Sequence, residues 1–184
     1  MTPAIAHRDA QPFLEVGFTL RERLHLLSRS IDPGEVYQLD ERPASILVRP
    51  ARRWHEKDVL TLDNEAFDSF WSFNRPALQE ALRATPNTRY RVAVRDDRVV
   101  GYAVTGHATN RGYLQRLAVK PAEQGHGVGT SLIYDALRWL QQRRAGQVFV
   151  NTQESNVRAF ELYKHLGFKE EPQGLVVLSW ERPK

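Results

Sequence analysis

The sequence contains no cysteine among its 184 residues. This absence excludes disulfide bonds, thiolate metal sites and an acyl-enzyme formed on cysteine. Any acyl transfer would therefore have to proceed without a cysteine acyl-enzyme. The six histidines show no paired spacing of the kind that metal ligands have, so we expect no metal site.

Long apolar runs are also missing from the chain. No stretch approaches the roughly 20 apolar residues that a membrane-spanning helix requires. The first residues, Met1 to Asp9, lack the basic and then apolar pattern of a secretory signal peptide. We therefore expect a cytoplasmic protein with no membrane partner.

Charge of one sign is not concentrated anywhere. The chain has 26 basic and 22 acidic residues, giving a net charge of +4, and the basic residues are spread along it. Nucleic-acid-binding surfaces gather Lys and Arg on one face, so we expect no nucleic-acid partner. A mildly positive balance also suits an anionic cofactor, although an ordinary soluble surface is the more usual cause. The 41% apolar content is that of a globular domain.

Hydrophobic periodicity and turn residues predict an α/β fold. From Ile46 onwards the pattern predicts a strand, two helices, three strands, and then helix, strand, helix and strand. Asp96-Asp97 predicts the turn of a hairpin between strands 89–95 and 99–107. The strand 113–119 leads into a helix over about 127–143.

The first 44 residues are harder to interpret. Residues 1–12 have no periodicity, and we expect no fixed structure there. Beyond them, Phe18, Leu20, Leu24 and Leu26 alternate as in a half-buried strand, but Leu20, Leu24, Leu27 and Ile31 also fit a helix, so both interpretations stay open.

The most informative stretch is the glycine-rich loop 124–129, between the strand 113–119 and the following helix. The first turn of a helix leaves N–H groups without intrahelical partners, and glycines let an anion approach them. A Walker loop is excluded because the loop has no lysine. A dinucleotide fingerprint is excluded because Thr130 stands where its third glycine is required.

The pattern that remains is Gln-x-x-Gly-x-Gly, formed by Gln124, Gly127 and Gly129 after a strand ending in Leu-Ala-Val. A second block follows at Asn151–Asn156, Ala159-Phe160, Leu162-Tyr163 and Leu166-Gly167-Phe168. Together the two blocks resemble the GNAT superfamily, the acyl-CoA-dependent N-acyltransferases. The resemblance implies a mixed, mostly antiparallel twisted sheet flanked by helices, with the acyltransferase domain spanning residues 45–184.

The resemblance also implies acetyl-CoA as the acyl-donor co-substrate. Its pantetheine arm would pair with the backbone of Leu117, Ala118 and Val119, although a plain core strand would show the same residues. Asn156 and Phe160 would border the cofactor. The pyrophosphate would lie on the loop residues Gln124, Gly125, His126, Gly127, Val128, Gly129 and Thr130.

Tyr163 is the residue to which the resemblance assigns catalysis, as the acid that protonates the departing thiolate of coenzyme A. The alternative is a core tyrosine with its hydroxyl at the rim. No general base is evident, because Asn151 stands where family members that acetylate protein N-termini often have glutamate. We consider His107, Glu65 and Asp68 as candidate bases.

The acceptor is expected to be a primary amine of a small molecule or protein. The aromatic cluster Phe67, Phe70, Trp71 and Phe73 is expected to form a wall of its pocket, although aromatic clusters are more often core packing. Gln115 and Arg116, on the strand that leads to the acyl group, are expected on opposite faces. The alternative function is a non-catalytic acyl-CoA-binding sensor or scaffold.

We expect residues 1–44 to form a separate N-terminal extension. The segment Phe13–Phe18 echoes Tyr163–Phe168, since both end in Gly-Phe and an apolar strand follows each. We hypothesise that the extension is the remnant of a second GNAT-like unit that adds a strand to the main domain or to a partner subunit. A homodimer is one arrangement that this would allow.

Overall fold

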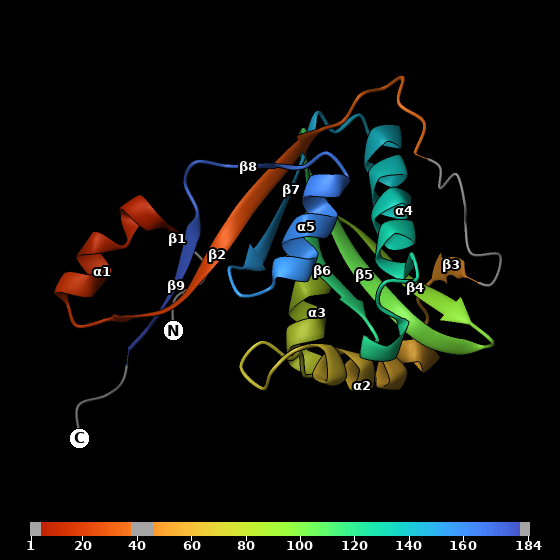
Figure 1. Ribbon diagram of the computed structural model, residues 1–184, viewed down its shortest axis with the longest axis horizontal. Helices are drawn as coiled ribbons and strands as arrows, with labels where there is room; N and C mark the ends of the chain where they lie inside the picture. Colours follow the sequence, from red (N-terminus) through yellow and green to blue (C-terminus); the bar gives the residue numbers. More distant parts are fainter. Residues whose placement is uncertain (1–4, 38–45, 181–184) are drawn as a thin grey trace. The chain divides into compact units, whose positions relative to one another are not determined.

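A computed structural model describes residues 5–37 and 46–180 (Figure 1). The chain divides into two compact units, and each is described here by itself. Unit 1 comprises Met1–Arg29 and Phe149–Lys184, and unit 2 comprises Ser30–Val148. The predicted boundary between residues 44 and 45 lies outside the described residues.

Unit 2 is built on an antiparallel sheet with the strand order β6-β5-β4-β3. Its strands are β3 (Leu47–Pro50), β4 (Asn87–Arg95), β5 (Arg98–Ala108) and β6 (Arg111–Val119). Asp96 and Asp97 join β4 to β5 with φ of 48° and 58°. Two successive positive φ angles match the right-handed twist of the flanking strands, which confirms the predicted hairpin.

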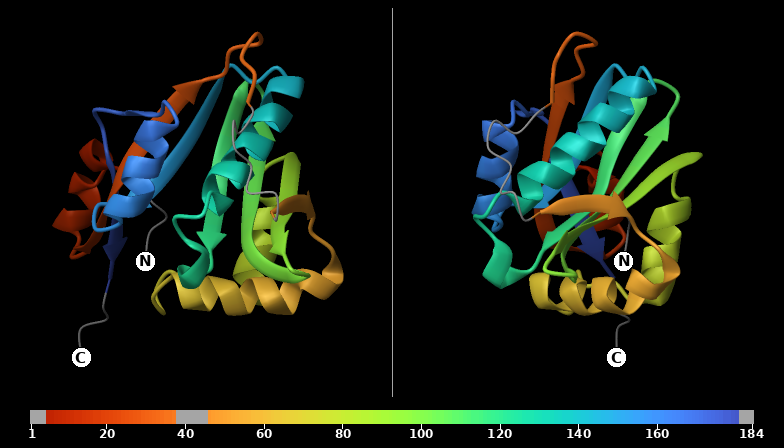
Figure 2. Two further views of the ribbon diagram at one scale, coloured as in Figure 1. Left: turned by 45° about the vertical axis from the view of Figure 1, so that its right-hand side comes forward. Right: turned by 90° about the vertical axis from the view of Figure 1, so that its right-hand side faces the viewer.

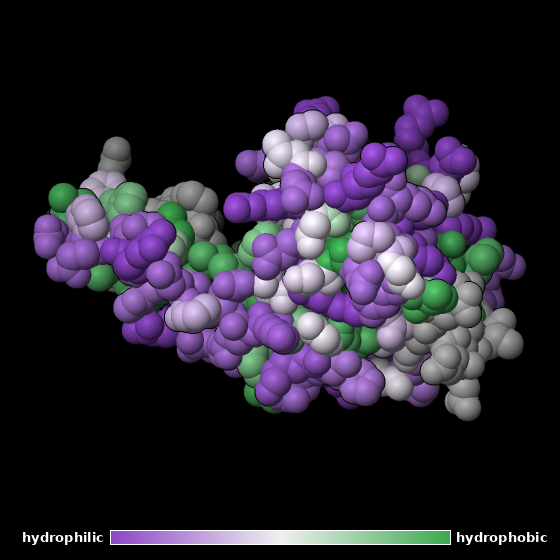
Figure 3. Space-filling model, turned by 90° about the horizontal axis from the view of Figure 1, so that it is seen from above, coloured by the Kyte–Doolittle hydropathy of each residue, from purple (hydrophilic) through white to green (hydrophobic). Residues whose placement is uncertain are grey.

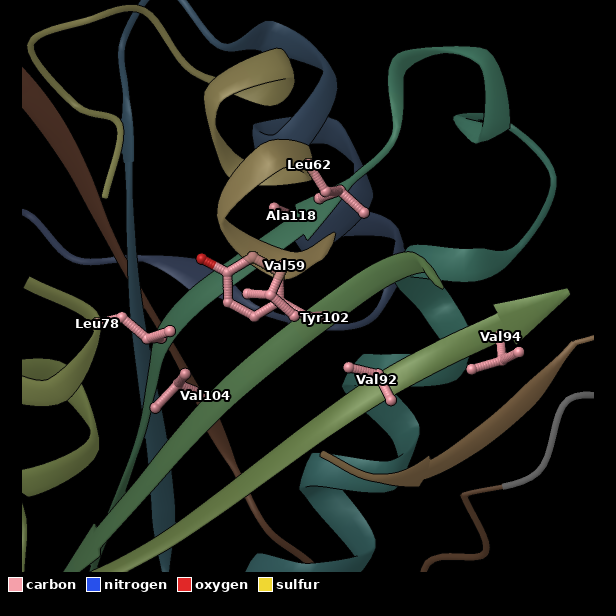
Figure 4. Close-up of a cluster of buried hydrophobic side chains, with 8 residues drawn as sticks. All are labelled: Val59, Leu62, Leu78, Val92, Val94, Tyr102, Val104 and Ala118. Atoms are coloured by element: carbon pink, nitrogen blue, oxygen red, sulfur yellow. The ribbon is translucent and has the colours of Figure 1, made fainter. Parts of the chain in front are cut away.

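Helices cover both faces of this sheet (Figure 2). The helices α2 (Glu56–Ala66) and α3 (Arg75–Arg83) pack on one face, and α4 (Val128–Gln142) packs on the other. Strand alternation explains this division, because successive side chains point to opposite faces. Figure 4 shows the core beneath α2 and α3, formed by Val59, Leu62, Leu78, Val92, Val94, Tyr102, Val104 and Ala118.

Short helical turns connect these elements. Within unit 2, η2 (Arg53–His55) leads into α2, and η3 (Pro121–Glu123) lies between β6 and α4. The core on the α4 face contains Ala93, Ala103 and Leu132, each at most 2% exposed. The predicted order of elements from Ile46 to β6 and α4 is confirmed.

Unit 1 contains the strands β1 (Ile5–Ala6), β9 (Leu175–Ser179) and β2 (Thr19–Ser30), with β9 pairing antiparallel to both of the others. The two-residue β8 (Lys169–Glu170) also pairs antiparallel with β2. Most of β7 (Gln147–Gln153) and all of the helix α5 (Val157–His165) belong to this unit. Residues 19–30 are thus a strand, which decides between the two interpretations of the sequence.

The prediction that residues 1–12 lack fixed structure is wrong for the residues that are described. They form β1, η1 (His7–Asp9) and the start of α1 (Gln11–Glu15). Ala10 is 4% exposed and packs with Val176 and Leu178 of β9. These elements are too short for periodicity to reveal, and contacts distant in sequence stabilise them.

Apolar side chains remain exposed at the N-terminal end of unit 1. Phe13, Leu14 and Val16 are 36%, 41% and 68% exposed. Figure 3 shows apolar residues in green on the surface at its left, where α1 lies in Figure 1. Across residues 5–37 and 46–180, no helix combines the length and apolar character needed to cross a membrane.

Candidate functional site

The glycine-rich loop has the backbone geometry that its sequence predicts. Gly125 and Gly127 have φ of 83° and 77°, in the left-handed region that glycine adopts without a steric cost. Gly127 is the N-cap of α4, which begins at Val128. The two glycines therefore allow the chain to turn between η3 and the start of the 15-residue helix α4.

The N-terminus of α4 is not capped by a side chain. The carbonyl of Gly127 accepts hydrogen bonds from the backbone N–H and the hydroxyl of Ser131, both at 2.9 Å. The Gln124 amide donates to the Val119 carbonyl at 3.2 Å, which ties the loop to the end of β6. Because the first N–H groups of a helix lack intrahelical acceptors, this end can bind an anion.

The last residues of β6 pack their side chains on both faces of the sheet and pair their backbone with β5. Ala118 is 3% exposed and packs beneath α2 and α3, whereas Leu117 and Val119 pack on the α4 face. In the ladder with β5, Leu117, Ala118 and Val119 pair with Ala103, Tyr102 and Gly101. The strand that leads into the loop is therefore fixed on both faces.

The other predicted site residues lie on α5 in unit 1. Asn156 is the N-cap, and its side chain accepts a hydrogen bond from the Ala159 N–H at 3.1 Å. The ring of Phe160 lies 4.2 Å from that of His25. Tyr163 is 4% exposed, and its ring centroid lies 5.5 Å from that of Phe168.

Burial raises the pKa of Tyr163 well above the usual value of a phenol. The hydroxyl is therefore protonated throughout the neutral range and has a proton to donate there. The predicted site residues are thus divided between the two units. Residues 117–130 belong to unit 2, and Asn156, Phe160 and Tyr163 belong to unit 1.

Residues 56–168 match the model of the acetyltransferase (GNAT) family, and this range is more than half of the chain. The chain belongs to the GNAT family. This result confirms the resemblance that the loop and the closing segment indicated. The matched range contains the four helices α2 to α5.

Known proteins share parts of this GNAT chain. The mycothiol acetyltransferase of Streptosporangium roseum is 46% identical over 52 residues, which are 28% of this chain and 15% of that relative. Among solved structures, a GCN5-related N-acetyltransferase from Sphaerobacter thermophilus has a TM-score of 0.68 at 19% identity, covering 95% of this chain and 57% of that one.

A second solved structure, the PaiA N-acetyltransferase of Thermoplasma acidophilum in complex with coenzyme A, has a TM-score of 0.62 at 14% identity. The match covers 74% of this chain and 99% of that one. At such identities the likeness shows a common fold, which confirms the predicted fold class. The chain spans only 15% of the length of the mycothiol acetyltransferase that it matches.

Unit 2 also contains a buried ion pair that the sequence-based predictions missed. Asp63 of α2 is fully buried and accepts hydrogen bonds from Arg116 Nε and Nη2 of β6, at 2.8 and 2.7 Å. The Tyr102 hydroxyl and the Phe73 N–H also donate to this carboxylate. A lone arginine within the apolar strand 113–119 is the signal that could have revealed the pair, since a buried charge requires a partner.

Arg116 also contacts two of the four aromatic residues that were predicted to form a pocket wall. Its guanidinium carbon lies 3.5 Å from the ring centroid of Phe67 and 4.0 Å from that of Phe73. Phe70 and Trp71 pack edge to face at 5.1 Å, and the Trp71 carbonyl accepts from Arg116 at 2.8 Å. Phe67 and Phe73 are therefore used to hold Arg116, which fixes the connection between α2 and α3.

The expectation that Gln115 and Arg116 lie on opposite faces is wrong. The β5–β6 register shifts between Val104 and Thr105, so Gln115 is the extra residue of a bulge. A Cβ at Gly106 would lie 2.8 Å from the Gln115 amide nitrogen and 2.5 Å from the hydroxyl of Thr85, which follows α3. Gln115 therefore lies on the same face as Arg116, which reaches α2.

Each candidate general base has a structural role. Asp68 accepts hydrogen bonds from the backbone N–H groups of Phe70 and Trp71 at 2.9 and 3.1 Å, and Glu65 lies 4.0 Å from Lys120. His107 is 8% exposed and packs edge-on against Trp139 of α4. Within the described parts of the chain, no group of three His, Cys, Asp or Glu side chains is placed to hold a metal ion.

Proposed function

We propose that this chain is an N-acetyltransferase that moves acetyl from acetyl-CoA directly to a primary amine. The observation that carries the proposal is the left-handed Gly127 at the uncapped N-terminus of α4, which follows β6 through η3. Membership of the GNAT family supports the same chemistry. The absence of cysteine favours direct transfer over an acyl-enzyme formed on cysteine.

In the proposed site, the backbone of residues 124–130 binds the pyrophosphate. The N–H groups at the start of α4 and the positive end of its dipole supply the attraction. Leu117, Ala118 and Val119 offer backbone groups to the pantetheine arm, as an extended ligand pairs with a strand. The exposed His126 side chain contributes less than the backbone does.

In the proposed chemistry, the acceptor nitrogen attacks the thioester carbonyl carbon, and the carbon–sulfur bond then breaks. The thiolate that leaves takes a proton from the Tyr163 hydroxyl, and Tyr163 recovers a proton released by the acceptor nitrogen. The phenol is protonated before the step, and because burial raises its pKa and makes it a weaker acid, the proton moves only as negative charge develops on the sulfur. Asn156 and Phe160 border the cofactor on the same helix.

The acceptor is an unidentified primary amine of a small molecule or protein. Asn151 is exposed on β7 and cannot serve as a base, so the family's glutamate has no counterpart at this position. We therefore expect an acceptor that arrives as the neutral amine or that loses its proton to water. A cytoplasmic location and acetyl as the preferred acyl group complete the proposal.

Calorimetric titration with acetyl-CoA tests the loop assignment. Gly127→Glu places a carboxylate at the helix N-terminus, where it repels phosphate, and we expect no detectable binding. Thr61→Glu, on the exposed side of α2, adds the same charge elsewhere in unit 2 and should bind as the unaltered protein does. Equal affinity of the two variants would refute the phosphate-binding role.

A further inference from the structure

Unit 1 contains a hollow of about 610 Å³ that the proposed acetyl transfer does not use. Its lining comes from η1, from β2, from the residue after β7, and from residues 170–176, which run from β8 into β9. The volume lies within the range of about 300–1,000 Å³ that small-molecule sites occupy. Charged and polar side chains dominate the lining, so a hydrophilic occupant fits it best.

Backbone hydrogen bonds preform the walls of this hollow. The His7 N–H donates to the Gly174 carbonyl at 3.2 Å, and the Glu171 N–H donates to the Leu26 carbonyl at 2.8 Å. The segment between β8 and β9 is thereby held against both η1 and β2. Because the site is preorganised, a ligand would bind without the entropic cost of ordering this segment.

Most charges in the lining already have partners. Glu170 lies 2.6 Å from His25 Nδ1, and Glu171 accepts a hydrogen bond from the Ser28 hydroxyl. Arg8 lies 3.6 Å from its neighbour Asp9. Each of these side chains thus has a partner within the protein, although the Ser28 hydroxyl is neutral and Glu171 keeps its negative charge.

Two lining residues of opposite charge remain, Arg23 of β2 and Glu154 after β7. Across the described residues, neither side chain makes a hydrogen bond or an ion pair. Their backbones are bonded, because the Glu154 N–H donates to the Arg23 carbonyl at 3.2 Å. One unpaired positive group and one unpaired negative group therefore lie at neighbouring positions of the same hollow.

Such a pair selects against ligands that carry one charge only. An amine is attracted by Glu154 and repelled by Arg23, and a carboxylate experiences the reverse. A molecule that carries both groups on neighbouring atoms satisfies both residues. We propose that this hollow binds a small zwitterion of the α-amino-acid class, with its carboxylate on Arg23 and its ammonium group on Glu154. The planar guanidinium suits a bidentate contact with a carboxylate.

One lining residue contacts α5. His25 lines the hollow, and its ring stacks at 4.2 Å on Phe160, which lies three residues before Tyr163. The side chain of His25 would therefore lie between the ligand and α5, the helix that carries the proposed catalytic residue Tyr163. Binding at this site is independent of acetyl-CoA and can be measured without it.

Calorimetric titration of the full chain with L-alanine, L-glutamine and L-lysine tests the proposal. We expect saturable binding of at least one of them, at least tenfold stronger than that of its N-acetyl and methyl ester analogues, which each lose one charge. Arg23→Gln and Glu154→Gln should each weaken this binding about tenfold or more. Both side chains are exposed, so we expect both variants to keep the melting temperature of the unaltered protein.

Matched substitutions outside the hollow are Arg98→Gln and Glu80→Gln, at exposed positions of unit 2, and these should bind as the unaltered protein does. The proposal is overturned if none of the amino acids binds at about 10 mM. Equal binding of the singly charged analogues overturns it too. Preferential binding of spermidine would overturn it as well and identify a polyamine site instead.

Discussion

Asp63→Ala is the substitution with the largest expected effect on stability. The carboxylate is fully buried and accepts four hydrogen bonds, two of them from Arg116, which is itself 9% exposed. Without it, the guanidinium keeps the Trp71 carbonyl and the rings of Phe67 and Phe73 but has no counter-charge. Removing one partner of a buried ion pair costs about 3–5 kcal/mol.

A double-mutant cycle separates the ion pair from the packing around it. Arg116→Met alone leaves a buried carboxylate with only the Tyr102 hydroxyl and the Phe73 N–H as donors. Asp63→Leu alone is the other single variant of the cycle, and Asp63→Leu with Arg116→Met removes both charges and substitutes apolar side chains. We expect the double variant to be more stable than the sum of the single losses predicts, by at least about 2 kcal/mol.

Urea unfolding followed by circular dichroism and by tryptophan fluorescence measures these free energies of unfolding. Arg116→Lys is the conservative comparison, because an ammonium group cannot reproduce the planar fork that contacts Asp63 and the two rings. We expect it to lie between Arg116→Met and the unaltered protein. A loss below about 1 kcal/mol for Asp63→Ala, or additive single losses, would refute the role of the pair in fixing the α2–α3 connection.

Three other perturbations test other parts of the molecule. Tyr163→Phe should leave acetyl-CoA affinity nearly unchanged and lower turnover at least tenfold in thiol-release assays; unchanged turnover would remove the acid assignment. A variant that begins at Ala44 loses β2, which is the partner of β8 and β9. We expect this variant to be unfolded or aggregated in thermal melting and analytical gel filtration. Unchanged stability and oligomeric state would refute the hypothesis that the N-terminal residues are an integral part of the fold. Burial raises the pKa of both Tyr90 and Tyr102 in the folded protein, so the unfolded chain loses these protons at a lower pH than the folded chain does. The free energy of unfolding, measured by urea titration, should therefore fall as pH rises above about 10. A free energy of unfolding that stays constant up to about pH 11 would contradict this.

Most elements of unit 2 could be predicted because their signals are local. The hairpin at Asp96-Asp97, the proline that begins α3 and the glycines before α4 each specify backbone geometry within a few residues. The helix α4 also buries a long apolar face, so its periodicity extends over four turns. These elements agree with the prediction to within a few residues.

The elements that were missed depend on contacts distant in sequence. The structure of residues 5–10 depends on Val176 and Leu178, and β8 depends on Leu27 and Ser28 of β2. No pattern within these short segments records such partners. The bulge at Gln115 also depends on pairing, because it arises from a register shift that one strand alone does not show.

The site shows the same division between local and distant signals. The loop geometry around Gly127 follows from its own residues, whereas the pairing of Arg116 with Asp63 joins positions 53 residues apart. The density of aromatic residues in the sequence reveals the aromatic cluster, but the use of Phe67 and Phe73 to hold a guanidinium follows only from the structure. Family membership supports the proposed chemistry, and the acceptor depends on side chains that family membership does not specify.

Release of free thiol from acetyl-CoA, measured across a panel of peptide N-termini, lysine peptides, polyamines, aminoglycosides and amino acids, tests the proposed acetyl transfer most directly. Calorimetric binding of acetyl-CoA should be measured on the same preparation. We predict thiol release that depends on one acceptor class and that Tyr163→Phe reduces at least tenfold. Tight binding of acetyl-CoA without turnover on any acceptor would contradict the catalytic proposal and identify a sensor or scaffold.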